Sequence, residues 1–213
     1  QPPRNLLVIM TIAMTFAFAT WMALLNNFVI ARASFTGKEI GILQSIREIP
    51  GFMAFSAVFV LLLIKEQTFA YIALALLGIG VAITGYFPSA LGLYLTTFLM
   101  SVGFHYYETV KQSLSLQWLT IDEAPGVLGK LIAVSSIASL MVYSFLWVAQ
   151  RYLDLSYEVI YLVGGGGCLV LALIMWLGFP RFESATPQRK HLLLRKRYWL
   201  FYALTFMSGA RRQ

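Results

Sequence analysis

The chain has 213 residues, of which 59% are hydrophobic and only 12% are charged. Because soluble domains carry about 25% charged residues, this composition and a mean hydropathy of +0.75 exclude an ordinary soluble domain. A single cysteine excludes a disulfide framework. Apolar segments of roughly 20 residues, each long enough to cross a bilayer, recur along the chain. We therefore expect an all-α, polytopic membrane helix bundle.

Apolar runs bounded by glycine, proline and charged residues predict six membrane spans. They lie near residues 6–30, 40–64, 68–87, 89–117, 127–149 and 158–179, and a seventh span begins at Tyr198. The first run is too long for the core of a cleavable signal peptide. The connections are short, so we expect no soluble domain between the spans.

This pattern predicts three regions along the chain. Residues 1–180 form a six-helix transmembrane bundle, residues 181–197 a basic cytoplasmic linker, and residues 198–213 the start of a seventh span. An interfacial amphipathic helix on anionic lipid is the alternative for the linker, because "RKHLLLRKRYW" mixes cations with Leu and Trp. Two terminal arginines are costly in hydrocarbon. We therefore expect a longer protein whose C-terminal bundle is absent here, with an interfacial tail as the alternative.

The distribution of lysine and arginine predicts the orientation of the bundle. Nine such residues fall on the side of the N-terminus, and three fall on the other side. The nine are Arg4, Lys65, Lys130, Arg181, Arg189, Lys190, Arg195, Lys196 and Arg197, and the three are Arg32, Lys38 and Arg151. We therefore expect a cytoplasmic N-terminus in a plasma membrane, such as a bacterial inner membrane. The net charge of +7 is chiefly a topology signal, so no nucleic-acid partner is expected.

The fourth predicted span carries a polar stripe on one helical face. At 100° per residue, Leu95, Leu99 and Tyr106 occupy the opposite side. The stripe comprises Thr97, Ser101, His105, Glu108, Lys111, Gln112 and Ser115. A charge at the bilayer centre costs about 2.5–3.5 kcal/mol or more, so we expect this face to meet a water-filled cavity or another polar face. The alternative is a Glu108–Lys111 pair that only staples the helix, which does not account for the length of the stripe.

The second predicted span repeats the pattern in "GILQSIREIPGF". Gln44, Ser45 and Glu48 share a face, and Arg47 lies at its edge. Because adjacent residues lie about 100° apart on a helix, we expect Arg47 and Glu48 to have separate partners. Pro50 removes a backbone hydrogen bond and is expected to kink the span.

The other spans carry weaker signals. The first places hydroxyl, sulfur and amide groups on one face, for hydrogen bonds to a substrate or to a neighbouring helix: Thr11, Thr15, Met22 and Asn26. The fifth has a small-residue face expected to serve packing: Gly126, Gly129, Ala133 and Ser136. The "GGGG" at residues 164–167 lacks the context of a phosphate loop and is interpreted as structural. Neither His105 nor His191 has a catalytic or metal-binding neighbour in the sequence, and Cys168 has no nearby base, so we expect no enzyme, metal or cofactor.

Two stretches, "FTGKEIGILQSIREIPGF" and "RKRYWLFYALTFMSGARRQ", resemble a second span and a linker with seventh span in major facilitator superfamily transporters. As architecture, the whole chain resembles the N-terminal half of such a transporter. The resemblance implies two six-span bundles of inverted three-span repeats, a midplane site and alternating access. It also implies that the first, fourth and seventh spans line a cavity. The loop pattern Gly-x-x-x-Asp-Arg-x-Gly-Arg-Arg and the Gly-Pro pair of the fifth span are absent, which disfavours a drug/proton exchanger.

We therefore expect a secondary transporter, either a symporter or an antiporter, that moves a small polar solute. Counting Arg47, Lys111, Arg211 and Arg212 against Glu48 and Glu108 leaves two excess cations in the membrane, which favours an anionic solute. Glu108 is the candidate proton carrier, with His105 as its partner. The expected pathway residues are Asn26, Gln44, Arg47, Glu48, Ser101, His105, Glu108, Lys111, Gln112, Arg211 and Arg212.

Two alternatives remain open. A non-transporting scaffold or assembly factor of the same fold would pair these charges permanently and bind another membrane protein. An uncharged solute such as a sugar would suit the aromatic side chains of Trp21, Tyr106 and Tyr107, although aromatics in spans more often serve packing. A transporter's polar stripes should converge on a water-accessible cavity, whereas those of a scaffold should be sealed.

Overall fold

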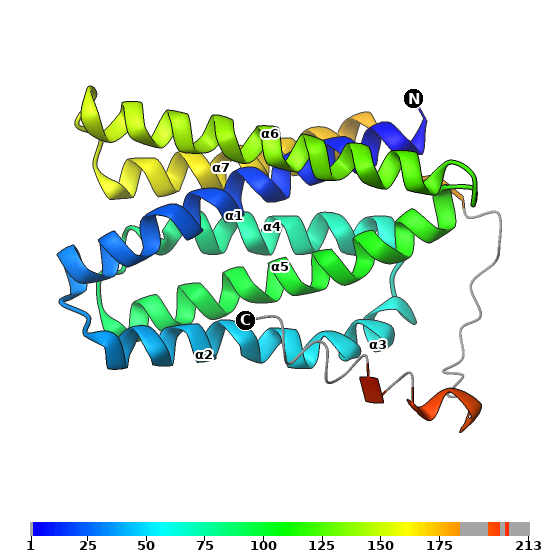
Figure 1. Ribbon diagram of the computed structural model, residues 1–213, viewed down its shortest axis with the longest axis horizontal. Coiled ribbons are helices and arrows are strands. Elements are labelled where there is room, and N and C mark those ends of the chain that lie inside the picture. Colours follow the sequence, from blue (N-terminus) through cyan, green and yellow to red (C-terminus); the bar gives the residue numbers. More distant parts are fainter. Residues whose placement is uncertain (1, 184–195, 201–202, 205–213) are drawn as a thin grey trace.

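Antiparallel helices make up most of the chain in a computed structural model, which describes residues 2–183, 196–200 and 203–204 (Figure 1). The long helices are α1 (Pro3–Ala33), α2 (Gly37–Met53), α4 (Glu66–Thr84), α5 (Ala90–Trp118), α6 (Ala124–Arg151) and α7 (Tyr157–Gly178). The short η1 (Ala54–Ser56) and α3 (Ala57–Leu61) continue α2, and η2 (Lys196–Tyr198) follows α7 in sequence. The all-α class is confirmed, and each boundary of the six predicted spans lies within three residues of a helix end.

Four of these helices are long and apolar enough to cross a membrane: α1, α4, α6 and α7. The other two long helices carry the charged residues of the predicted polar stripes, and α2 has only 17 residues before it breaks. Together with the composition, the four apolar helices indicate a membrane protein. The predicted seventh span falls mostly outside the described residues.

The second span is not a single α-helix. It begins with a capping box, in which the backbone N–H of Thr36 donates to Glu39 Oε2 at 2.9 Å and the Thr36 side chain accepts from the Glu39 N–H; Thr36 Oγ1 also accepts from the Lys38 N–H. Pro50 lies inside α2, which ends three residues later at Met53 and passes into η1 and α3. Regular α-helical geometry therefore ends just beyond Pro50, and the kink at Pro50 stays a prediction.

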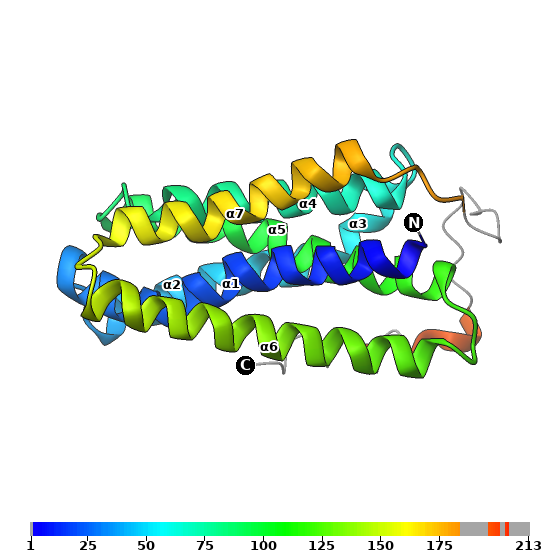
Figure 2. The same ribbon diagram turned by 90° about the horizontal axis from the view of Figure 1, so that it is seen from above.

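The helices form two layers. α1 packs against α4, α5, α6 and α7, while α4 packs against α5 and α7, and α2 packs mainly on α5. Figure 2 shows α4 and α7 on one side of α1 and α6 on the other. In Figure 1, α6, α1, α5 and α2 lie across the near face in that order. The candidate site lies on this four-helix face.

α4 and α7 form the back layer behind the four-helix face, and glycines allow α4 to approach both α7 and α5 closely. A Cβ at Gly103 of α5 would collide with the backbone of Leu77, and one at Gly165 of α7 would collide with the backbone of Ala82 in α4. The structural interpretation of "GGGG" is therefore confirmed. The packing prediction for α6 is wrong at Gly126 and Gly129, where no described atom lies within 4 Å of an added Cβ.

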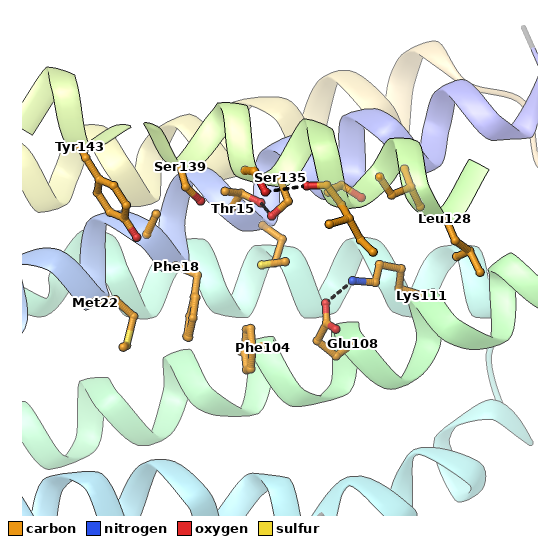
Figure 3. Close-up of a pocket in the computed structure, with 16 residues that line it drawn as sticks. Thr15, Phe18, Met22, Phe104, Glu108, Lys111, Leu128, Ser135, Ser139 and Tyr143 are labelled. Atoms are coloured by element: carbon orange, nitrogen blue, oxygen red, sulfur yellow. Dashed lines mark hydrogen bonds and ion pairs between the residues drawn. The ribbon is translucent and has the colours of Figure 1, made fainter. Parts of the chain in front are cut away.

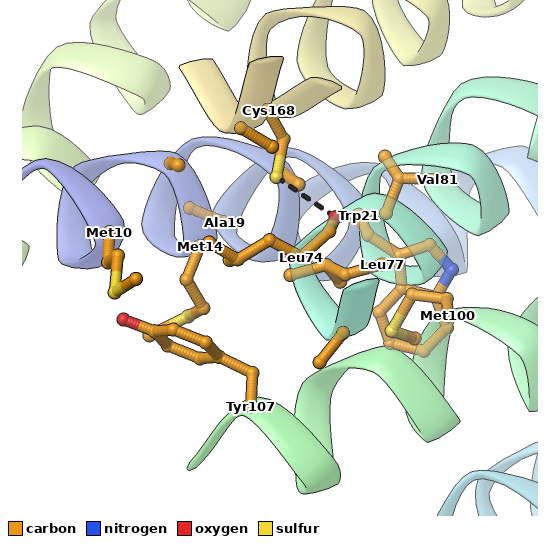
Figure 4. Packing of buried hydrophobic residues seen from close by; sticks show 14 of the residues in the cluster. Met10, Met14, Ala19, Trp21, Leu74, Leu77, Val81, Met100, Tyr107 and Cys168 are labelled. Carbon is orange, nitrogen blue, oxygen red and sulfur yellow. Dashed lines mark hydrogen bonds between the residues drawn. The ribbon is translucent and has the colours of Figure 1, made fainter. Parts of the chain in front are cut away.

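The hydrophobic core lies where α1, α4, α5 and α7 meet (Figure 4). Trp21 and Tyr107 are fully buried in it. The Cys168 thiol donates to the Leu74 carbonyl oxygen at 3.4 Å, which agrees with its expected packing role. This core holds α1 and α5 in place, and their opposite faces form the candidate site.

Candidate functional site

Two neighbouring cavities open on the four-helix face. The smaller, of about 440 Å³, lies between α1, α2 and α5, and the larger, of about 700 Å³, lies between α1, α5 and α6. They share four lining residues: Phe18, Met22, Phe104 and Glu108. The Phe18 and Phe104 rings stack with their centroids 4.1 Å apart and form part of the shared wall.

The polar stripes of α2 and α5 meet at the smaller cavity. It is lined by six of the predicted pathway residues: Arg47, Glu48, Ser101, His105, Glu108 and Gln112. This convergence agrees with helical periodicity, which placed the α5 residues on one face. The Ser101 hydroxyl also donates to the Arg47 carbonyl oxygen and so ties α5 to α2.

Arg47 and Glu48 form an ion pair with each other. Arg47 Nη2 lies 2.6 Å and Nε 2.9 Å from the same Glu48 oxygen, Oε1, and the two side chains are only 20% and 18% exposed. The expectation of separate partners was therefore wrong. Helical geometry separates the two Cβ directions, but the long arginine side chain bends back to reach its neighbour.

Glu108 and Lys111 form the second ion pair, with 2.5 Å between Lys111 Nζ and Glu108 Oε1. The side chains are 37% and 23% exposed respectively, so this pair is more accessible than the first. Glu108 lines both cavities, whereas Lys111 lines the larger one. Figure 3 shows both side chains projecting from α5 toward α6.

His105 occupies space left by a glycine of α2. A Cβ at Gly51 would lie 2.9 Å from His105 Cε1, so a larger residue there would displace the imidazole. The ring also packs edge-on against Phe104, with 5.1 Å between centroids. His105 therefore lines the smaller cavity close to the α2 break.

The larger cavity combines an apolar wall with a row of hydroxyl groups. Sequence reasoning missed Ser135, Ser139 and Tyr143 of α6, which face α1 across it (Figure 3). Ser135 Oγ lies 2.9 Å from Thr15 Oγ1 and links α6 to α1. The three residues recur every four positions, but α6 also carries Lys130, Ser136 and Ser144, so their spacing alone does not identify this face.

Several predicted pathway residues lie elsewhere. Asn26 is exposed and lines neither cavity. Gln44 also lines neither cavity, and its Oε1 is buried without a hydrogen-bond partner among the described residues. Arg211 and Arg212 fall outside the described residues. The aromatic case for a sugar is also weakened, because Trp21 and Tyr107 are in the core.

The described ionisable lining is charge-balanced if His105 is neutral. Arg47 and Lys111 face Glu48 and Glu108, which gives two cations and two carboxylates. The cationic excess that favoured an anionic solute thus rests on Arg211 and Arg212 alone. Within the described part of the chain, no cluster of three or more His, Cys, Asp or Glu is placed to bind a metal.

Comparison with known proteins assigns the chain to no family. The chain matches no protein-family model and no curated protein. The resemblance to major facilitator transporters therefore rests on the sequence pattern, and the functional argument rests on the site itself.

Proposed function

We propose that the chain is the N-terminal part of a secondary transporter of major facilitator type, which moves a small polar solute by alternating access. The observation that carries this proposal is the convergence of two polar helix faces, on α2 and α5, on one open cavity. Burying ionisable groups in a membrane is costly, so their grouping around a cavity favours a solute pathway. The second six-span bundle would cover the same four-helix face.

Helix packing supports the proposed inverted three-span repeats. The first repeat would be α1, α2 with its continuation η1–α3, and α4, and the second would be α5, α6 and α7. If each helix is exchanged with its counterpart in the other repeat, most helix contacts map onto one another. The α1–α6 contact corresponds to α5–α2, and α1–α7 corresponds to α5–α4. The α1–α4 contact has no counterpart of similar extent between α5 and α7. This near-symmetry is what two related halves around a central site would produce.

Proton coupling is assigned in this proposal to Glu108 with His105. Both line the smaller cavity, and Glu108 also lines the larger one, so its side chain is accessible from both cavities. Protonation of Glu108 would release Lys111 from its ion pair and thereby change the charge that a solute meets. The same proposal includes a cytoplasmic N-terminus and a plasma-membrane location, following the lysine and arginine distribution.

A membrane scaffold is the second candidate, because both charge pairs on the face are closed within the chain. In that case the four-helix face would bind another membrane protein, and the pairs would only compensate buried charge. The open cavities of about 440 and 700 Å³ favour the transporter.

Solute flux tests the proposal directly. The full-length protein in proteoliposomes would be screened with organic anions, sugars, zwitterions and cationic drugs under an imposed pH gradient, beside Glu108→Gln. We expect one class to move and Glu108→Gln to abolish its coupling to protons. Asp122→Asn removes an exposed carboxylate outside the cavities and should behave as wild type. Absence of flux for every class, with Glu108→Gln changing only stability, would favour the scaffold.

A further inference from the structure

Opposite charges are unequally distributed between the two cavities. Among the lining residues, the smaller cavity has Arg47 against two carboxylates, Glu48 and Glu108. Lys111 lines only the larger cavity. A solute's cationic group is therefore compensated best on the smaller-cavity side of Glu108, and its anionic group on the side of Lys111.

Of the two ion pairs, Glu108–Lys111 is the one that a solute can open. Arg47 donates twice to Glu48 in a planar fork, which holds that pair in place. Lys111 donates one hydrogen bond to Glu108 from a flexible stem, and Glu108 is the most exposed of the four side chains. Incoming charged groups thus meet Glu108 and Lys111 first.

The closeness of this pair restricts the solute's head group. Because Glu108 and Lys111 lie one turn apart on α5, an ammonium on Glu108 and a carboxylate on Lys111 are best supplied by neighbouring positions of one molecule. A zwitterion leaves the cavity neutral, whereas a simple anion or cation leaves one charge uncompensated in it. Occupancy of Glu108 by the ammonium excludes its proton, which is the competition that proton-coupled exchange requires.

The remainder of the solute fits the larger cavity. The volume of this cavity is about 700 Å³, and its apolar wall beside Lys111 includes Met14, Phe18 and Leu131. We infer that the solute class is an apolar α-amino acid or a molecule with the same head group: ammonium and carboxylate on one carbon, with a bulky apolar substituent. This inference rests on the proposed transport function.

A set of matched solutes tests it with the full-length protein in proteoliposomes. Leucine is compared with its isomer ε-aminocaproate, whose charges are far apart, with isocaproate, which lacks the amino group, with isoamylamine, which lacks the carboxylate, and with glycine. We expect uptake of leucine to exceed that of each other compound by about tenfold or more, the ratio that one lost charged contact produces.

Two variants, at Lys111 and Glu108, should change the ratios between solutes, which a purely structural role of these residues would leave unchanged. Lys111→Gln should raise uptake of isoamylamine relative to leucine, and Glu108→Gln should raise that of isocaproate. Lys130→Gln and Asp122→Asn change exposed charges outside the cavities and should leave both ratios unchanged. If the cavity variants do not fold, the wild-type comparison alone decides.

The outcomes separate the inference from the proposed function. Equal uptake of ε-aminocaproate and leucine would overturn the head-group assignment. Uptake of isocaproate, a sugar or a cationic drug without leucine would overturn the inference and leave the transporter in place. No flux for any compound in either panel would overturn both.

Discussion

The back layer and the four-helix face are built differently. Buried side chains make up most of the apolar segment of α4, but only a small minority of that of α6. α4 packs extensively on both α5 and α7, whereas α6 packs chiefly on α1 and α2 chiefly on α5. The back layer is joined by backbone contacts at glycines, whereas α2 and α6 are joined to the face by buried side chains such as Leu43 and Val142 and by polar contacts around the cavities.

This difference separates stability from solute access within one bundle. Tight helix contacts without large side chains favour a fixed arrangement, since small residues allow close backbone packing in membranes. Helices held on one side only can shift with less loss of contact, which alternating access would require of the face. Substitutions in the back layer should therefore chiefly reduce stability, and those on the face should chiefly change transport.

The largest expected effect is at Gly165, where an added Cβ would meet the backbone of both Ala82 and Gly78. Gly165→Ala should lower the free energy of unfolding by about 3 kcal/mol, the upper end for overpacking, because backbone atoms cannot rotate away. Thermal or denaturant unfolding in detergent measures the change.

The neighbouring glycine supplies a matched control. A Cβ at Gly166 meets no described atom within 4 Å, so Gly166→Ala should be neutral or stabilising by up to about 1 kcal/mol through helix propensity. Equal losses at the two positions would show that the α4–α7 contact is not the tight one.

The next effect is expected at Gln67, at the end of the back layer. Its Nε2 donates to the Tyr71 hydroxyl and the Pro180 carbonyl, and its Oε1 accepts from the Phe182 N–H, each at 2.9 Å. Gln67→Met keeps the approximate volume but removes the partner of the Pro180 carbonyl and of the Phe182 N–H, while the Tyr71 hydroxyl still donates to the Met175 carbonyl, so a loss of about 1–3 kcal/mol is expected. Gln112→Met, at an exposed position on the cavity, should change stability by less than about 0.5 kcal/mol.

The same contrast explains what the sequence could predict. Span boundaries and the polar face of α5 follow from hydrophobic periodicity, and His105 and Glu108 do line a cavity. Helical periodicity does not predict which charged side chains form ion pairs, as the Arg47–Glu48 pair demonstrates. The role of each glycine was also hidden, because Gly129 and Gly165 both lie in predicted spans and only tertiary packing gives one of them a close neighbour.

Hydroxyl groups explain the missed part of the site. The hydroxyl of a serine or threonine in a membrane helix can donate a hydrogen bond to a carbonyl of the preceding turn, as Ser136 does to the Ile132 carbonyl at 3.0 Å. Their presence therefore carries little information about a cavity without knowledge of the neighbouring helix. Ser135 becomes informative only through its contact with Thr15, 120 residues away in sequence.

On the face, the Glu108–Lys111 pair should contribute little to stability. A double-mutant cycle with Glu108→Gln, Lys111→Gln and the double variant should give a coupling free energy of about 1 kcal/mol or less, since both side chains are partly exposed. Unfolding in detergent measures the coupling, and flux measures function in the same samples. A coupling of several kcal/mol would instead assign the pair to holding the bundle together.

The smallest effect is expected at the start of α2, at the edge of the face. The Thr36 hydroxyl, followed by its backbone N–H, holds the pKa of the exposed Glu39 carboxyl below its usual value of 4.5. A carboxyl whose pKa is lower in the folded state stabilises the fold above the unfolded-state pKa, and this contribution is lost as pH falls through the folded-state pKa. Unfolding measured from pH 6 downward should therefore show a small acid-dependent loss of stability.

Thr36→Ala removes the hydroxyl that lowers this pKa most, so its stability should depend less on pH in the same acid range. Ser45→Ala is the matched control, because that exposed hydroxyl donates only to the Gly41 carbonyl on the preceding turn. An unchanged acid dependence in Thr36→Ala would mean that the capping box does not hold α2 at this end. The α2 side of the cavity would then depend on its tertiary contacts, which include Ser101 with the Arg47 carbonyl, His105 against Gly51, and Arg47 with Met22 of α1.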